Sequence, residues 1–341
     1  MMRKVLSYDD VLLVPKYSDI TSRSEVDITT DLDKVITLDI PVIGAPMDTV
    51  VGTEMAAALS DMGTFGVLHR YCTINEQVDM VSEVIGRSLG EHPIAAAIGA
   101  TGDFLERATE IVGAGAEILC VDVAHGHHQL VKRAIGQLRG AFGSDIHIMA
   151  GNVATAQAFE DLSNWGADSI RVGVGGGAAC STRTRTGHGL PVLDSIMRCA
   201  ESAGSAMLIA DGGVRGSGDI VKAIAAGADL VMVGSLLAGT DESPGSVITD
   251  ERTGHKRKVY RGMASGDAQN SWRNKVSVVE GVSTTVPYKG SVVDVMENIV
   301  GGIRSGLSYS GCQNLNQLRL TATFVNQTSA ALAESKPHIL G

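Results

Sequence analysis

The chain has 341 residues, 44% of them hydrophobic and 19% charged, which is typical of a globular protein with a large core. Its formal net charge of −10 argues against a surface that binds nucleic acid or an anionic membrane. No apolar run approaches the roughly 20 residues of a membrane span. Five scattered cysteines without a CxxC pair indicate free thiols in a reducing cytoplasm, not a zinc site or disulfides.

From residue 41 onward, short apolar runs alternate with helix-like stretches. The runs are, in chain order, PVIGAPMD, FGVLH, IAAAIGA, ILCVDVAHG, IHIMAGNV, SIRVGVGGG, MLIADGGV and LVMVGSLLAG. The helices that follow the first seven are expected at residues 54–62, 75–85, 103–112, 128–139, 154–165, 193–203 and 218–226. Near-continuous apolar runs suit strands that are covered on both faces, and their alternation with helices predicts a parallel sheet. Eight such units predict an α/β protein, a single (β/α)8 barrel over residues 1–341, with an open doubly wound sheet as the alternative.

The alternation stops after Gly239. Residues 240–290 are rich in glycine, serine, threonine and charge, so we expect an irregular, mobile flap after the eighth strand. The flanking sequences KVYRG and VPYKG look like ordered anchors, and a closing helix is expected at residues 292–304. Nothing in the sequence suggests a second domain.

Polar or glycine-rich residues follow six of the predicted strands, at 44–48, 122–126, 151–152, 173–180, 211–213 and 234–235. In a barrel these strand ends meet on one face, where the active site lies. The GG of ADGGV and the GS of MVGSLLAG follow consecutive strands, a pattern typical of a phosphate site built from backbone amides, although tight turns alone would also explain it. Asp211, directly before the glycines, is placed to accept hydrogen bonds from a ribose diol.

A cysteine, Cys180, ends the glycine-rich stretch GVGGGAAC. Most cysteines are small buried hydrophobic residues, and we interpret the other four in that way. Exposed amides in a loop after a strand can stabilise a thiolate, which makes Cys180 a candidate nucleophile. On the residues alone, the buried and the nucleophilic interpretations both remain open.

The segment DVAHGHH follows the fourth strand. Asp122 is either the N-cap of the next helix or a polar ligand at the mouth of the barrel. His125, His127 and His128 lack carboxylate or cysteine companions at ligand spacing, so no metal site is predicted. No GxGxxG motif follows the first strand, so a dinucleotide would lie across the barrel mouth and not in a Rossmann domain.

Taken together, these stretches resemble the IMP dehydrogenase and GMP reductase family along nearly the whole chain. The matching motifs, all in the family's order, are SYDDVLLVPKYSDITSRSEVDI, APMDTV, LHRY, MAGNV, RVGVGGGAACSTRTRTG, ADGGVR, MVGSLLAGTDESPG, VYRGMAS and VPYKGSVVDV. The resemblance implies a (β/α)8 barrel that binds a purine nucleotide monophosphate. It also implies that a loop cysteine attacks C2 of the base and that a nicotinamide cofactor exchanges hydride there.

The resemblance assigns roles to individual residues. It makes Cys180 the nucleophile and gives proton transfer to Thr182 and Glu280. It implies a substrate site with Asp211 at the ribose, Met263 at the base, and phosphate contacts from Gly213, Gly234, Ser235 and Tyr260. It places Asp122, Gly173 and Gly175 at the cofactor, and the carbonyls of Gly175, Gly177 and Cys180 around a monovalent cation such as K+. Where the family often has proline and serine, this chain has Gly176 and Ala178, which removes one hydroxyl contact to the phosphate.

Two features of the sequence help to decide between the dehydrogenase and the reductase branches of the family. Most dehydrogenases carry a regulatory CBS pair inserted in the barrel, whereas GRSLGEHPIAA joins the strands directly here. Dehydrogenases also need a long flap with an Arg-Tyr pair whose arginine activates water. Here the segment between GMAS and VEG is short and contains WRN, with Arg273 only seven residues before Glu280. DVAHGHH and LHRY also resemble reductases, while the tail ESKPH leans to the dehydrogenase.

The expected activity is therefore that of a GMP reductase, in which NADPH or NADH drives the reductive deamination of GMP to IMP and ammonia through a thioimidate on Cys180. An IMP dehydrogenase with an atypical short flap is the alternative, and a catalytically silent nucleotide-binding relative is a third reading. The family suggests a homotetramer.

Overall fold

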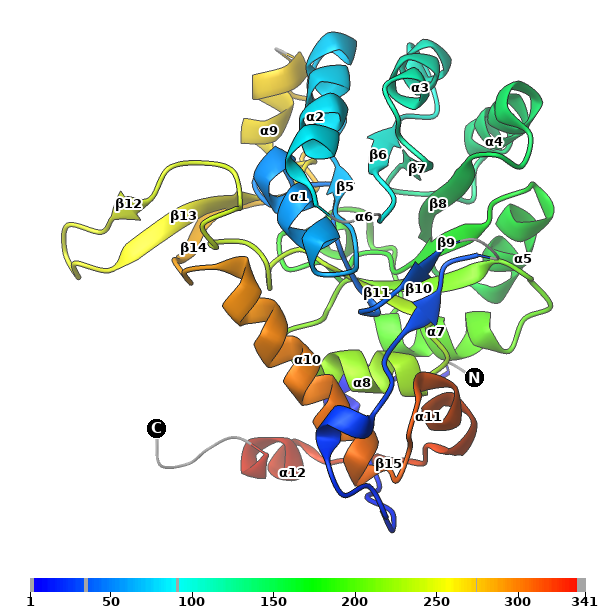
Figure 1. Ribbon diagram of the computed structural model, residues 1–341, viewed down its shortest axis with the longest axis vertical. Helices are drawn as coiled ribbons and strands as arrows, with labels where there is room; N and C mark the ends of the chain where they lie inside the picture. Colours follow the sequence, from blue (N-terminus) through cyan, green and yellow to red (C-terminus); the bar gives the residue numbers. More distant parts are fainter. Residues whose placement is uncertain (1–2, 34–35, 90–91, 274, 336–341) are drawn as a thin grey trace.

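The computed structural model describes residues 3–33, 36–89, 92–273 and 275–335, without the side chain of Arg273. The end of the ESKPH motif and two residues of the GRSLGEHPIAA linker lie outside this range. The described chain forms a ring of parallel strands surrounded by helices, as Figure 1 shows. Within it, no helix is both long enough and apolar enough to cross a bilayer.

Eight parallel strands form the barrel, in the order β4-β11-β10-β9-β8-β7-β6-β5. Their bounds are β4 Val42–Gly44, β5 Val67–Leu68, β6 Ala95–Ile98, β7 Ile118–Asp122, β8 His147–Val153, β9 Ser169–Val172, β10 Met207–Asp211 and β11 Leu230–Val233. An isolated parallel bridge between Gly44 and Gly66 links the two ends of the sheet. All eight predicted strands are confirmed, and the barrel is the predicted fold.

Helices cover the outside of the barrel. They are α1 Thr53–Asp61, α2 Ile74–Arg87, α3 Phe104–Gly113, α4 Gln129–Phe142, α5 Ala156–Asn164, α7 Val192–Ala200, α8 Ser217–Ala225 and α10 Val292–Tyr309. Each lies within a few residues of its predicted range, because its apolar face repeats at helical spacing and packs on the sheet. Apolar side chains also fill the barrel, among them Ile43, Met149 and Met232.

The region at residues 240–290 is more ordered than its composition predicts. Strands β12 Ile248–Thr249, β13 Lys256–Arg261 and β14 Ser283–Pro287 form an antiparallel sheet that projects from the barrel (Figure 1), and α9 Gly266–Arg273 lies between β13 and β14. The expectation of an irregular region is therefore wrong for β12 and α9, whereas β13 and β14 overlap the segments KVYRG and VPYKG, which the sequence predicts to be ordered. Their strands pair only with one another, so they lack the continuous apolar runs of strands that are buried on both faces.

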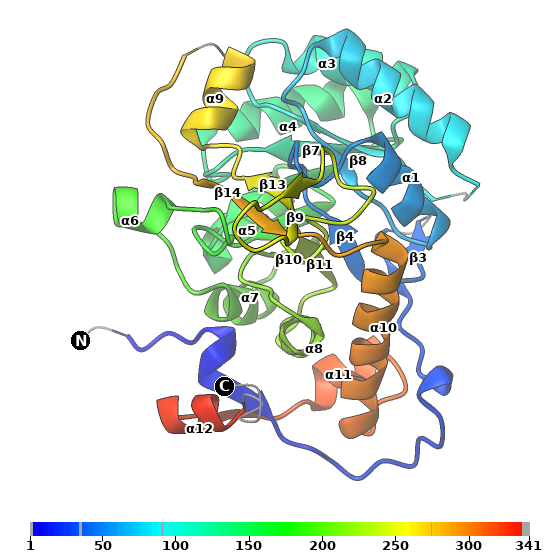
Figure 2. The same cartoon turned by 90° about the vertical axis from the view of Figure 1, so that its left-hand side faces the viewer.

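The terminal segments pack together at the base of the molecule (Figure 2). The short helix η1 Tyr8–Asp10 leads into β1 Val11–Leu13, which pairs antiparallel with β15 Phe324–Asn326. The remaining short elements are η2 Arg23–Glu25, β2 Thr30–Asp31, β3 Thr37–Leu38, α6 Thr182–Thr186, α11 Leu315–Thr321 and α12 Ser329–Glu334. The pairing of β1 with β15 thus joins the two terminal segments in a small sheet separate from the barrel.

Candidate active site

A cavity of about 470 Å3 opens at the carboxyl ends of the barrel strands. That volume is typical of small-molecule sites. Its walls include most of the predicted site residues, namely Asp122, Gly173, Gly175, Gly177, Cys180, Thr182, Asp211, Tyr260, Met263 and Glu280. Gly213, Gly234 and Ser235 are not among the lining residues, although Gly213 directly follows Gly212, which is.

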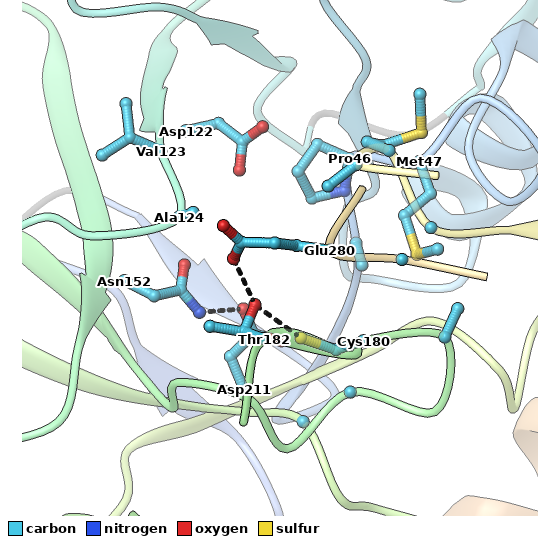
Figure 3. Close-up of a pocket in the computed structure, with 18 of the residues that line it drawn as sticks. Pro46, Met47, Asp122, Val123, Ala124, Asn152, Cys180, Thr182, Asp211 and Glu280 are labelled. Atoms are coloured by element: carbon cyan, nitrogen blue, oxygen red, sulfur yellow. Dashed lines mark hydrogen bonds between the residues drawn. The ribbon is translucent and has the colours of Figure 1, made fainter. Parts of the chain in front are cut away.

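Three of these side chains form a hydrogen-bonded chain, drawn with dashed lines in Figure 3. The thiol of Cys180 donates to Thr182 Oγ1 at 3.2 Å, and the Thr182 hydroxyl donates to Glu280 Oε2 at 2.9 Å. Cys180 is exposed to the cavity, whereas Cys120, Cys199 and Cys312 are buried and Cys72 is partly buried. The arrangement of a thiol, a hydroxyl and a carboxylate is that of an activated nucleophile with its proton acceptor.

Backbone hydrogen bonds hold the cysteine loop against the segment that carries Glu280. Ser181 N donates to Glu280 O at 2.9 Å, Val282 N donates to Ala179 O at 2.9 Å, and Cys180 forms an antiparallel bridge with Gly281. A Cβ on Gly281 would lie 2.9 Å from the nitrogen of Ser265, so only glycine permits this close approach. Cys180 and Glu280, 100 residues apart in sequence, are thereby held next to each other.

The glycines before Cys180 let the loop turn tightly over the strand ends. Gly173 has a φ of +152°, and a Cβ there would lie 1.8 Å from the carbonyl oxygen of Asp211. Gly175 has a φ of +77°, and its missing side chain leaves space for Arg183, whose Nε and Nη2 donate to the carbonyl of Val174 at 3.3 Å. Arg183, which the sequence left without a role, therefore braces the cysteine loop.

A buried ion network, which we call the charged floor, lies at the bottom of the cavity. Arg171 on β9 donates to Asp122 on β7 at 2.7 Å and to Asp211 on β10 at 2.9 and 3.0 Å. Asn152 donates to the same oxygen of Asp211 at 2.7 Å (Figure 3). The side chain of Arg171 is 8% exposed, and those of Asp122 and Asp211 are 14% and 15% exposed.

The charged floor fixes the ionisation of Asp122 and Arg171. Burial raises the pKa of Asp122, but the Arg171 and Arg70 guanidiniums outweigh it and hold that pKa below its usual range. Burial alone would lower the pKa of Arg171, yet Asp211, the Cys120 thiol and Asp122 raise it well above its usual value. Sequence reasoning missed Arg171, although an arginine inside the apolar run SIRV was a signal of a paired buried charge.

Asp122 does not cap a helix, so that interpretation is wrong. The N-cap of α4 is His128, whose Nδ1 accepts from Leu130 N at 3.1 Å. Instead, Tyr71 Oη donates to Asp122 Oδ2 at 3.3 Å, and Arg70 Nη2 donates to the carbonyl of Asp122 at 3.1 Å. Within the described ranges, no group of three histidine, cysteine, aspartate or glutamate side chains is arranged to bind a metal ion.

An aromatic wall stands beside Asp122. The ring of Trp272 from α9 contacts Tyr71 edge to face, with 5.0 Å between centroids, and the Arg70 guanidinium lies 4.9 Å from the centre of the Tyr71 ring. Arg70, Tyr71 and Trp272 all line the cavity. Aromatic faces with an adjacent guanidinium suit a flat cationic or aromatic ring with attached phosphates, so these residues fit a nicotinamide cofactor.

The residues expected at the substrate phosphate lie on neighbouring turns. A Cβ on Gly234 would lie 3.5 Å from Tyr260 Oη, and Gly213 has a φ of +76° at the turn after β10. Burial and the nearby Asp211 raise the pKa of Tyr260 to about 12, which keeps its hydroxyl protonated as a donor. Met263 Sδ lies 3.5 Å from Asp48 N, at the wall of the cavity.

Comparison with known proteins places this geometry in a family. The model of the IMP dehydrogenase / GMP reductase domain matches residues 5–338. The chain belongs to the IMP dehydrogenase / GMP reductase family. It is therefore an oxidoreductase that acts on purine nucleotide monophosphates with a nicotinamide cofactor.

Relatives of both branches are similar to this chain. An inosine-5'-monophosphate dehydrogenase of Nitrosopumilus maritimus is 36% identical over 468 residues, covering 98% of both chains. Because that alignment is much longer than 341 residues, the relative contains segments without a counterpart here. A GMP reductase of Leishmania major is 32% identical, covering 98% of this chain and 96% of the relative.

A solved structure is also similar to this chain. A cysteine-to-alanine variant of GMP reductase from Trypanosoma brucei, in complex with guanosine 5'-monophosphate, superposes with a TM-score of 0.93 at 31% identity. The match covers 99% of this chain and 98% of that one. The barrel and its connections are therefore those of the family.

Proposed function

We propose that the protein is a GMP reductase, which converts GMP, NADPH and a proton into IMP, ammonia and NADP+. The proposal rests on two observations. One is the hydrogen-bonded chain from Cys180 through Thr182 to Glu280, and the other is the set of residues before Glu280 that line the same cavity. Between Met263 and Glu280, the described residues along the cavity are Ala264, Gln269, Trp272, Ser277 and Val278. None of these side chains is a base, so these residues offer no group beyond Glu280 to activate water for hydrolysis of a covalent intermediate, which supports the reductase.

In this proposal Cys180 passes its proton through Thr182 to Glu280 and adds as a thiolate to C2 of guanine. Glu280 returns the proton through Thr182 to the departing amino group, so that ammonia leaves and the carbon–sulfur bond remains. The nicotinamide cofactor supplies the hydride for C2 when it is bound. Cys180 then leaves with the electrons of the carbon–sulfur bond and takes up the proton that the overall reaction consumes.

In this proposal, the nucleotide and the cofactor bind to different parts of the cavity. Asp211, held by Arg171 and Asn152, would accept from the ribose of the nucleotide. Asp122, with Tyr71 and Trp272, would face the cofactor together with the Gly173 and Gly175 backbone. We propose NADPH as that cofactor, and K+ at the carbonyls of Gly175, Gly177 and Cys180, which a comparison of turnover in potassium and in lithium salts would test.

One pair of assays tests the activity. Purified protein with GMP and NADPH should lose absorbance at the reduced-nicotinamide band, whereas IMP with NAD+ should give no gain. A gain with IMP and NAD+ would instead support an IMP dehydrogenase, the alternative favoured by the 36% identity to the Nitrosopumilus maritimus enzyme. Absence of change in both assays would favour a nucleotide-binding relative without turnover.

A further inference from the structure

The hydroxyl of Tyr8 is a buried hydrogen-bond donor whose role the contacts within the fold do not explain. Tyr8, in the first helical turn η1, is only 4% exposed, and no residue that the structure describes provides a hydrogen-bond partner for its Oη. A buried polar group without a partner lowers stability, so a tyrosine here is harder to explain than a phenylalanine. An unpartnered buried hydroxyl is expected where a ligand completes its hydrogen bonding.

The ring lies against the turn that follows β10. A Cβ on Gly213 would lie 3.5 Å from Tyr8 Cε2, the carbon next to the one that carries the hydroxyl, and 3.7 Å from Cδ2. The same turn packs on the cysteine loop, since a Cβ on Gly212 would lie 3.0 Å from the nitrogen of Gly177. Tyr8 therefore sits where the glycine turn, the cysteine loop and the N-terminal segment meet.

Several contacts hold η1 in this position. Lys222 Nζ on α8 donates to the carbonyl of Tyr8 at 2.9 Å, and Arg215 Nη1 donates to Asp9 Oδ2 at 3.0 Å. From the other end of the chain, Gln327 Nε2 donates to the carbonyl of Asp9 at 2.8 Å. The helical turn that carries the ring is therefore anchored by residues from two distant parts of the chain, 215–222 and 327.

The chemistry of the hydroxyl suits an anion. Burial, together with Asp219 and Asp211, raises the pKa of Tyr8 far above its usual value, so the hydroxyl remains a donor at every physiological pH. Asp211 is the residue expected at the nucleotide ribose, and glycine turns after the last two strands of a barrel are common phosphate sites. A phosphate attached to that ribose would lie toward the Gly213 turn, on which the Tyr8 ring packs.

We propose that the Tyr8 hydroxyl donates a hydrogen bond to the phosphate of the bound purine nucleotide. The inference rests on the proposed function only in that the ligand is a purine nucleotide monophosphate. It does not depend on the direction of the redox reaction, because GMP and IMP carry the same phosphate.

The test is binding of nucleotides against nucleosides by isothermal titration calorimetry. Tyr8→Phe removes the hydroxyl and keeps the ring, and Tyr17→Phe is the matched control because Tyr17 is 89% exposed. Tyr8→Phe should weaken GMP and IMP about tenfold, the usual loss for a hydrogen bond to a charged group, and leave guanosine and inosine unchanged. The melting temperature of the free variant should equal or exceed that of the wild type, because an unpartnered hydroxyl has been removed.

Unchanged affinity for both monophosphates in Tyr8→Phe would overturn the inference, as would an equal loss for the nucleosides. Failure of the wild type to bind either monophosphate would also overturn it. In contrast, a wild type that binds both monophosphates but does not oxidise NADPH with GMP would contradict the reductase proposal alone. Turnover and binding thus separate the two proposals.

Discussion

The floor and the roof of the cavity are built in different ways. The charged floor of Asp122, Arg171 and Asp211 belongs to barrel strands and is held by buried ion pairs. The roof segment, residues 262–282, lies outside the barrel sheet, and parts of it are exposed, such as Val278 at 68%. It is held by backbone hydrogen bonds to the cysteine loop. We therefore expect substitutions in the floor to affect stability, and substitutions in the roof to affect mainly the proposed proton transfer by Glu280.

The largest effect on activity is expected at Cys180, on the loop that the roof contacts. Cys180→Ala should lower kcat by roughly 10^3-fold or more, because no other cysteine in the described part of the chain lines the cavity. Steady-state assays check this, with Cys72→Ala as the control because Cys72 lies outside the cavity lining. Retention of full activity by Cys180→Ala would contradict covalent catalysis by this cysteine.

The floor should respond most strongly in stability. Arg171→Met should lower the free energy of unfolding by about 3–5 kcal/mol, because it leaves two buried carboxylates without their partner. Urea denaturation measures this, and Arg133→Met on the exposed face of α4 is a control that should change little. Equal losses in the two variants would show that the floor is not a stabilising network.

The roof should respond in activity alone. Glu280→Gln should reduce kcat about 100-fold, the usual contribution of a positioned general acid or base, while the free energy of unfolding changes by no more than about 0.5 kcal/mol. Assays of turnover and denaturation on the same preparation compare the two effects. If Glu280→Gln lost as much unfolding free energy as Arg171→Met, the roof would contribute to stability as the floor does, and the proposed difference between them would be wrong.

A smaller effect is expected where the roof contacts the wall. Trp272→Ala should raise the KM for the nicotinamide cofactor about three- to tenfold, the equivalent of one lost aromatic contact, with little change in the KM for GMP. Trp165→Ala on the far side of α5 is a control, since Trp165 does not line the cavity. A change confined to the KM for GMP would place the cofactor elsewhere.

The smallest effect concerns pH. Burial lowers the pKa of His69 below 6.5, an effect that Asp48 opposes and Arg261 reinforces. The unfolded chain then binds a proton at His69 before the folded one does, so stability falls as pH decreases below 6.5. His69→Gln should reduce the difference in unfolding free energy between pH 7.5 and pH 5.5.

The lowered pKa of Asp122 predicts that the contribution of Asp122 to the unfolding free energy is retained throughout that range and lost only at more acidic pH.

The sequence predicted the barrel because strands covered on both faces appear as continuous apolar runs, and it predicted Cys180, Thr182 and Glu280 from motifs. It did not predict the contacts of Arg171, because Asp211 lies 40 residues away on the adjacent strand β10 and Asp122 lies 49 residues away on β7, two strands from β9. Local patterns cannot show which strand a charge will face. The sheet in residues 240–290 was also missed, because its polar strands pair only with each other.

The pairing of β1 with β15 has a consequence for synthesis on the ribosome. The segment that holds Tyr8 is made more than 300 residues before the strand and the glutamine that anchor it, up to Gln327. Until then η1 lacks the hydrogen bond from Gln327, and β1 lacks its pairing with β15. A nascent chain that already contains all eight barrel strands would therefore still bind a nucleotide more weakly than one in which residues 324–327 have emerged.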